Sequence, residues 1–231
     1  MASGDFRKRQ LITSIYLPSL LITAAEGALL PILPVSAVLY GASLAEAGVV
    51  VTVLMLSTMI FEIPASILVS KIGERNAMLA STVLGFAMTS VAFFQFGYWS
   101  LILSALGFGA AHSLFGLSRH SLLAEIVPEQ HRPKSMSLLG GMFRGGMAIG
   151  PVIGSAFIAL YGDEFGYLAA ARICLAAGAS VLTVPSRRLT VSPSGQNGNL
   201  WAVTKREAPK LATLGIASAI ISAGRTIRLI G

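Results

Sequence analysis

A chain of 231 residues with 54% hydrophobic and 12% charged residues lacks the polar surface of a water-soluble fold, since soluble domains carry about 25% charged residues. The net charge of +7 does not indicate nucleic-acid binding, because the basic residues stand in short clusters between long apolar runs. The single cysteine, Cys174, excludes a disulfide framework within the chain. Composition therefore favours a membrane protein whose main partner is the lipid bilayer.

Six apolar runs follow one another along the chain, and each is long enough to cross a hydrocarbon core of about 30 Å as a helix. The first run follows a basic cluster, but it is too long for a signal peptide and lacks a small-residue cleavage site, so it is predicted to stay as a span. The predicted spans are 11–39, 48–69, 77–96, 98–123, 135–161 and 165–184. Pro18, Pro31 and Pro34 are expected to break up the first helix.

The connections between these spans fall into two groups by charge. Those around Gly41, around Gly97 and at 162–164 contain no lysine or arginine, whereas the others are basic. By the positive-inside rule, the N-terminus 1–10 and the segment 186–210 are predicted to be cytoplasmic, in a multi-pass protein of the plasma membrane. The basic residues on that side are Arg7, Lys8, Arg9, Lys71, Arg75, Arg132, Lys134, Arg187, Arg188, Lys205, Arg206 and Lys210.

The last part of the chain is different in character. Residues 186–210 are polar and contain proline, serine and glycine, which is typical of a flexible linker. The apolar run after it is too short to span a membrane, so 211–231 is predicted to be an incomplete seventh helix. The expected organisation is a six-helix bundle at 11–185, a cytoplasmic linker and the start of another helix.

The loop after the second span carries a motif. It is similar to the signature G-x-L-a-D-[RK]-x-G-[RK]-[RK] of the major facilitator superfamily. The matching residues are Leu68, Lys71, Gly73 and Arg75, while Ser66 and Ser70 replace the glycine and the aspartate. The loss of the aspartate puts in doubt the latch between two halves that the resemblance implies. The alternative is an ordinary short cytoplasmic loop, which also needs a tight turn and positive charge.

A glycine motif lies in the fifth span. Its residues Gly146, Gly150, Pro151 and Gly154 resemble the fifth-helix antiporter motif of the drug/proton exporters in the same superfamily. Residues four apart share one helical face, so the glycines are expected to let a second backbone approach closely. Pro151 removes one helical hydrogen bond and can bend the helix. The alternative is a packing stripe without a role in function.

The fourth span is also similar to the family, around Gly107 and Gly109, although Leu103 stands where the family has an arginine. The resemblance covers roughly residues 10 to 231 but only half of the family's twelve-helix fold, in which the substrate lies between two six-helix halves. It implies an all-α membrane fold with six transmembrane helices arranged as two inverted three-helix repeats.

Charged residues inside the spans are the candidate functional residues, because a charge in hydrocarbon costs about 2.5 kcal/mol or more. Glu26 lies deep in the first span and is the first candidate for proton coupling, since desolvation favours the neutral form of a carboxyl group. Arg144 points away from the glycine stripe, towards the cavity or an acidic partner, and a pair with Glu26 is one hypothesis. Glu62 and Arg119 are the remaining candidates, and Arg119 lies near enough to a helix end to reach water.

These residues suggest transport rather than catalysis. The resemblance implies proton-coupled export of small amphipathic solutes, with protons and a second six-helix half as partners. His112 is expected to be a packing histidine rather than a proton relay. The sequence has no nucleophile elbow, phosphate loop or metal-spaced His/Cys set, so no enzyme activity, metal or cofactor is expected. The alternatives are a truncated half-transporter and a six-helix membrane scaffold without transport of its own.

Overall fold

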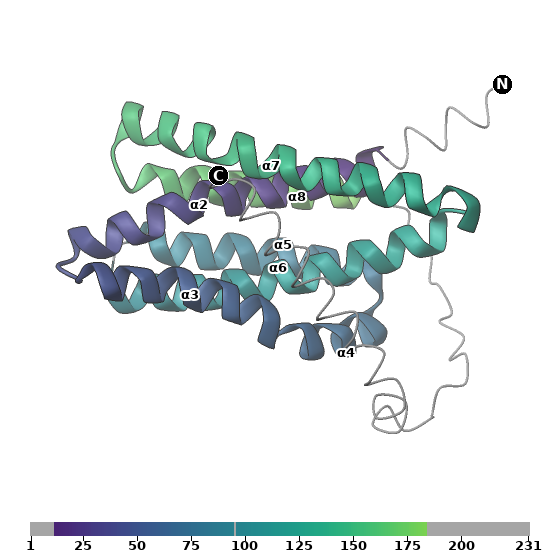
Figure 1. Ribbon diagram of the computed structural model, residues 1–231, viewed down its shortest axis with the longest axis horizontal. Helices are drawn as coiled ribbons and strands as arrows, with labels where there is room; N and C mark the ends of the chain where they lie inside the picture. The colour runs from purple at the N-terminus through teal and green to yellow at the C-terminus, as the bar shows by residue number, and fades with distance from the viewer. Residues whose placement is uncertain (1–11, 95, 184–231) are drawn as a thin grey trace, which may run out of the picture. The chain divides into compact units, whose positions relative to one another are not determined.

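The computed structural model describes residues 12–94 and 96–183, which belong to the first of two compact units, 1–188 and 189–231 (Figure 1). Within these residues every regular element is a helix. The elements are a π-helix at Ile12–Tyr16, α2 Leu17–Leu39, α3 Leu44–Ile60, α4 Glu62–Ile72, α5 Glu74–Phe93, α6 Tyr98–Ile126, a 3-10 turn at Glu129–His131, α7 Arg132–Tyr161 and α8 Phe165–Leu182. The predicted N-terminus 1–10, linker 186–210 and seventh helix 211–231 lie outside the described residues.

The first span keeps its helix across its internal prolines. Pro18 stands in the first turn of α2, where its missing N–H costs nothing, and Pro31 and Pro34 lie inside the continuous helix. The expected break is therefore wrong. Neighbouring helices can hold a proline-containing span in shape, and α2 is packed along α7 and α8.

The second span is bent where one straight helix was expected. Helices α3 and α4 meet at Phe61 at an angle of 48°, and together they are apolar enough to form one crossing. Pro64 explains the break, because it has no N–H to donate to the carbonyl of Ile60, where α3 ends. With the other five apolar helices, the described residues provide up to six membrane spans.

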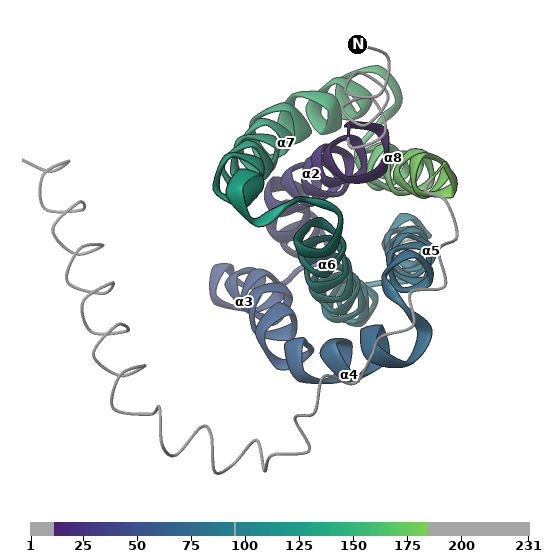
Figure 2. The ribbon, with the colours of Figure 1, turned by 90° about the vertical axis from the view of Figure 1, so that its right-hand side faces the viewer.

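The helix contacts follow the pattern of two repeats. Helix α2 packs along α7 and α8, while α6 packs along α3 and α5, and α5 packs against α8 (Figure 2). The first three spans, α2, α3–α4 and α5, correspond in order to the last three, α6, α7 and α8. Under this correspondence the contacts of α2 with α7 and α8 become those of α6 with α3 and α5. Because each repeat crosses the membrane an odd number of times, the second repeat begins on the opposite side. The predicted pair of inverted three-helix repeats is confirmed.

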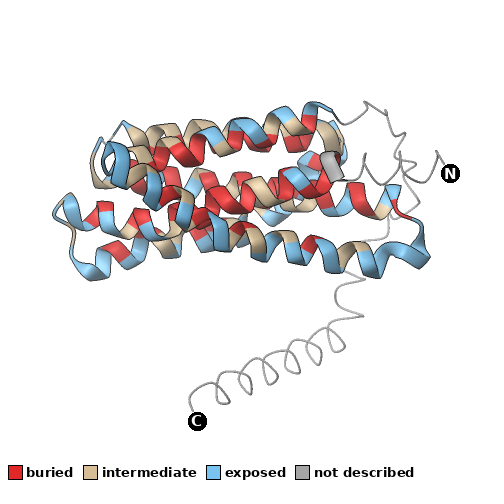
Figure 3. Ribbon diagram, turned by 90° about the horizontal axis from the view of Figure 1, so that it is seen from above, coloured by how far each residue is buried: buried red, intermediate tan, exposed pale blue. Residues whose placement is uncertain are grey.

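Burial follows the inward faces of the helices. Figure 3 shows buried residues running along the inner sides of the described helices and exposed residues along the outer sides. Phe108, Phe115 and Tyr167 are among the largest fully buried side chains. Many large apolar side chains, such as Leu44 and Trp99, are exposed, as expected where lipid replaces water at the surface. The chain is a multi-pass membrane protein with a polar exception in its interior.

Candidate functional site

That exception is a pair of ionisable side chains between the central helices. Glu26 of α2 and His112 of α6 approach each other, with 3.2 Å between the carboxylate Oε2 and the imidazole Nδ1. Both are largely buried, with side-chain exposures of 8% for Glu26 and 12% for His112. Within the described residues neither atom has a hydrogen-bond partner, so the pair meets the distance of an ion pair without hydrogen-bond geometry.

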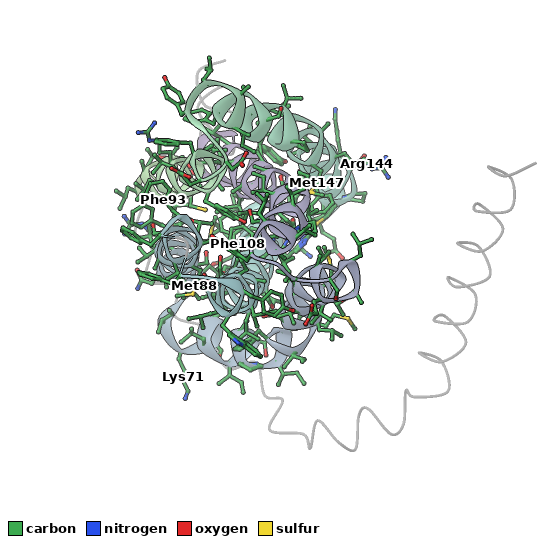
Figure 4. The ribbon with its side chains drawn as sticks, turned by 90° about the vertical axis from the view of Figure 1, so that its left-hand side faces the viewer. Lys71, Met88, Phe93, Phe108, Arg144 and Met147 are labelled. Carbon is green, nitrogen blue, oxygen red and sulfur yellow. The ribbon has the colours of Figure 1, made fainter. Side chains whose placement is uncertain are left out.

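The hypothesis that Glu26 pairs with Arg144 is wrong. Arg144 lies on the exposed side of α7, and Figure 4 shows it pointing outward from the bundle. The direction away from the glycine stripe was predicted correctly, but that direction leads out of the bundle and not towards α2. Arg144 remains a candidate for contact with a solute or a second half.

Arg119 adds a positive charge near the pair. It stands seven residues after His112, which places both on the same face of α6 about two turns apart. Only 7% of Arg119 is exposed, and its guanidinium carbon lies 5.9 Å from the centre of the Phe115 ring. The expectation that it reaches water is therefore wrong, because packing around α6 encloses this face of the helix.

The guanidinium of Arg119 retains unused donors. Its Nε and one terminal nitrogen are buried without a hydrogen-bond partner in the described part of the chain. Its charge acts on both Glu26 and His112. The three side chains form a charged cluster inside an apolar bundle, and we refer to Glu26, His112 and Arg119 as the buried cluster. A carboxyl, an imidazole and a fixed cation together can bind and release a proton.

The glycine stripe brings α7 against the helix that carries Glu26. Gly146, Gly150 and Gly154 are buried, and a Cβ at Gly150 would lie 2.8 Å from the backbone nitrogen of Ala28 on α2. Pro151 lies over Gly27, the residue next to Glu26, and α7 continues as one helix through it. Movement of α7 would therefore be transmitted directly to the backbone beside Glu26.

The loop motif lies where α4, α5, α6 and α8 meet, at the opposite end from the turn at Gly97. Gly73 has a φ of 81°, a conformation that side chains disfavour, and it lets α5 start directly after α4. Arg75 donates a hydrogen bond of 3.3 Å to the carbonyl oxygen of Leu182 at the end of α8. Ser121 of α6 donates one of 2.8 Å to the carboxylate of Glu74.

The other candidates of the loop region are exposed. Glu62 is the first residue of α4, immediately after the bend, and Leu68 and Lys71 lie on the outer side of the same helix. Figure 4 shows Lys71 pointing away from the bundle. None of these side chains belongs to the buried cluster.

A shallow cavity of about 200 Å³ lies between α2 and α7, and a smaller one of about 120 Å³ adjoins it. The larger is lined by Pro31, Ile32, Val35, Ser36, Pro151, Ser155, Ile158 and Asp163. No residue of the buried cluster lines either cavity, so the cavities do not mark the charged site. Among the described side chains there is no group of three that could hold a metal ion.

Comparison with known proteins identifies the family of the chain. The model of the Major Facilitator Superfamily matches residues 15–227. The chain is similar to a probable sugar efflux transporter of Pasteurella multocida, with 23% identity over 155 residues. That match covers 67% of this chain and 37% of the relative, so the matched region spans well under half of the relative's length.

Proposed function

The chain belongs to the major facilitator superfamily, and on that premise we propose that it forms the amino-terminal half of a transporter that exports small amphipathic solutes in exchange for protons. The observation that carries the proposal is the burial of Glu26 beside His112 and near Arg119. An ionisable group inside a membrane-spanning bundle is costly to keep, and such groups mark proton and substrate pathways.

The proposed mechanism uses the bundle as a rigid unit. Residues 11–185 would rock against a second six-helix half, linked by the cytoplasmic segment 186–210, so that Glu26 faces one side of the membrane and then the other. The close packing of α7 on α2 supports this picture, because the helix carrying Glu26 then moves with its neighbours. Arg144 and Glu62 are proposed as residues that meet the solute or the second half.

Sugars are the first solutes to test. The basis is the name of the relative, a probable sugar efflux transporter. A sugar presents both hydroxyl groups and an apolar ring face, so it fits the proposed class of small amphipathic solutes.

We place the protein in the plasma membrane with its N-terminus in the cytoplasm. The support is the charge of the loops: Lys71 and Arg75 lie at one end of the bundle, together with Arg132 and Lys134 at the start of α7. The turns at the other end, around Gly97 and Gly162, contain no basic residue. Positive charge gathers on the cytoplasmic side of membrane proteins.

The test uses inside-out membrane vesicles that contain the full-length protein to which this chain belongs. Radiolabelled glucose, lactose and a lipophilic amine are offered with an imposed proton gradient, acidic inside. We expect gradient-driven uptake of one probe by the wild type, its loss in Glu26→Gln, and its retention in the control Glu129→Gln, which changes an exposed carboxylate before the predicted span 135–161. Equal uptake by wild type and Glu26→Gln would refute the role of Glu26.

A wild-type protein that inserts normally and moves none of these probes would favour the membrane-scaffold alternative. In that case Glu26→Gln should change stability or partner binding and leave solute flux unaffected.

A further inference from the structure

We propose that Glu26 and His112 bind the exchanged proton jointly, as one site that bridges α2 and α6, with Arg119 as the fixed positive charge beside it. This inference rests on the proposed function, because it names the second residue of the same site. His112 is then a second proton-binding residue of this site and not a packing residue.

The geometry of the pair carries the inference. Oxygen and nitrogen atoms 3.2 Å apart are close enough to share a proton once the two side chains turn into hydrogen-bond geometry. The proton then sits on the imidazole opposite a carboxylate, or on the carboxyl opposite a neutral imidazole. Buried polar atoms are normally hydrogen-bonded, yet neither Glu26 Oε2 nor His112 Nδ1 has a partner within the described residues. One proton held between them satisfies both atoms at once.

Arg119 sets the charge of this site. With the carboxyl deprotonated and the imidazole neutral, the buried cluster has no net charge, because Arg119 balances Glu26. Binding of one proton makes the cluster positive, and the charge of Arg119 acts on both Glu26 and His112. After the proton leaves, the buried and unpartnered N–H groups of Arg119 are the available donors for the carboxylate.

The helices packed around the pair carry other ionisable groups, but among the described groups only Arg119 has a charge that acts on both Glu26 and His112. On α7 and α8, Arg144 and Arg172 are exposed and Cys174 is buried, while the buried Tyr167 donates its hydroxyl hydrogen to Ser36 Oγ at 2.8 Å. The remaining charged groups on α3, α4 and α5 are Glu46, Glu62, Lys71, Glu74 and Arg75. All five stand at or near helix ends or at the bend at Phe61, so Arg119 is the cation that the structure brings to the pair.

The position of the pair gives it a mechanical meaning. Helix α2 packs mainly on α7 and α8, and α6 packs mainly on α3 and α5, so direct contact between α2 and α6 is comparatively slight. A shared proton therefore joins two groups of helices within the bundle. Release of that proton to water on one side, and binding of another from the opposite side, would accompany each turnover of the exchange.

The test is a histidine titration that needs no solute. The full-length protein is labelled with ¹⁵N-histidine in nanodiscs of phosphatidylcholine and phosphatidylglycerol, and the resonance of His112 is assigned by its absence in His112→Gln. This chain contributes only three histidines, which keeps the assignment simple. Groups that titrate together interact by more than about one pH unit. We therefore expect Glu26→Gln to move the midpoint of His112 by about one pH unit or more.

Two controls make the result specific. Glu129→Gln changes an exposed carboxylate beside His131 and should leave the midpoint of His112 unchanged. Glu26→Asp keeps a carboxyl group and should retain an interaction with His112. This variant serves as the second test if Glu26→Gln fails to fold. A midpoint of His112 that is the same in wild type, Glu26→Gln and Glu26→Asp would overturn the shared proton.

The outcomes separate this inference from the proposed function. Gradient-driven flux that depends on Glu26, together with an independent His112 titration, would overturn the shared site and leave the transporter proposal standing. Coupled titration in a protein that moves no solute with protons would support joint proton binding and contradict its role in transport. If both hold, His112→Gln should reduce gradient-driven flux tenfold or more, whereas the control Glu129→Gln should leave it unchanged.

Discussion

Gly27 of α2 lies directly against Pro151 of α7, so that a Cβ at Gly27 would come within 3.2 Å of the proline Cδ. Gly27 follows Glu26 in the chain, and Pro151 belongs to the glycine stripe of α7. The motif that is similar to a family signature and the buried carboxyl are therefore neighbours in space. This contact connects the packing of the bundle to the charge that it encloses.

The close approach of α7 to α2 predicts that Gly150 tolerates no side chain. A Cβ at Gly150 would meet backbone atoms of α2, among them Gly27 C at 2.9 Å, and backbone atoms cannot move aside as a flexible side chain can. We expect Gly150→Ala to lower the free energy of unfolding by about 1–3 kcal/mol. The measurement is thermal unfolding in detergent. Gly140→Ala on the same helix is the control, because nothing lies within 4 Å of that Cβ, and equal effects of the two substitutions would contradict the packing.

Gly73 should resist substitution for a conformational reason. Its φ of 81° and ψ of 161° place it in a region where a Cβ is disfavoured by about 1–3 kcal/mol, although the space around it is open. Gly73→Ala is expected to lower the melting temperature, whereas Gly48→Ala, inside α3 and also in open space, should leave it unchanged or raise it. A melting temperature of Gly73→Ala equal to that of the wild type would show that this turn is not required.

The contact of Arg75 with Leu182 predicts a local effect at the end of α8. Loss of a hydrogen bond from a charged donor costs about 1.5–3 kcal/mol, less where water can replace it. We expect Arg75→Gln to accelerate amide hydrogen exchange near the end of α8 by about fivefold or more, since 1.4 kcal/mol corresponds to a factor of ten. Lys71→Gln changes a neighbouring exposed cation and should have no such effect. Unchanged exchange in Arg75→Gln would contradict the contact.

Glu26 and Arg119 are expected to depend on each other energetically. Removing one member of a buried charge pair leaves the other uncompensated, so Glu26→Gln and Arg119→Gln should each be destabilising. In a double-mutant cycle the combined loss should be smaller than the sum, with a coupling energy of about 0.5–3 kcal/mol. The free energy of unfolding is measured in mixed micelles for all four proteins. Additive losses would mean that Arg119 does not balance Glu26.

Much of the fold could be predicted from the sequence, because the cost of exposing backbone groups to lipid leaves few arrangements for apolar runs of this length. The positions of the spans and the two inverted repeats were predicted. The bend at Phe61 was not, although Pro64 gives the signal. The expected break of the first helix did not occur, since tertiary packing outweighs the local effect of Pro31 and Pro34.

The site was only partly predictable. The depth of Glu26 in the first apolar run made it stand out, but Arg144 was wrongly considered as its partner. Helical spacing predicts the direction in which a side chain points and does not say which helix lies there. His112 could have been found by depth, as it lies near the middle of α6, like Glu26 in α2. The seven-residue spacing from His112 to Arg119 also places both on one face. The sequence does not predict that α2 and α6 bring Glu26 and His112 together inside the bundle.

The measurement that tests the central claim most directly is proton release on solute binding. The full-length protein is placed in weakly buffered solution with a pH indicator, and the sugar or amine that is transported in vesicles is added. If solute and proton exclude each other at Glu26, linkage requires solute binding to release protons, and we expect up to about one proton per protein. Glu26→Gln should bind the same solute and release none. Equal release by wild type and Glu26→Gln, with equal solute binding, would contradict the account.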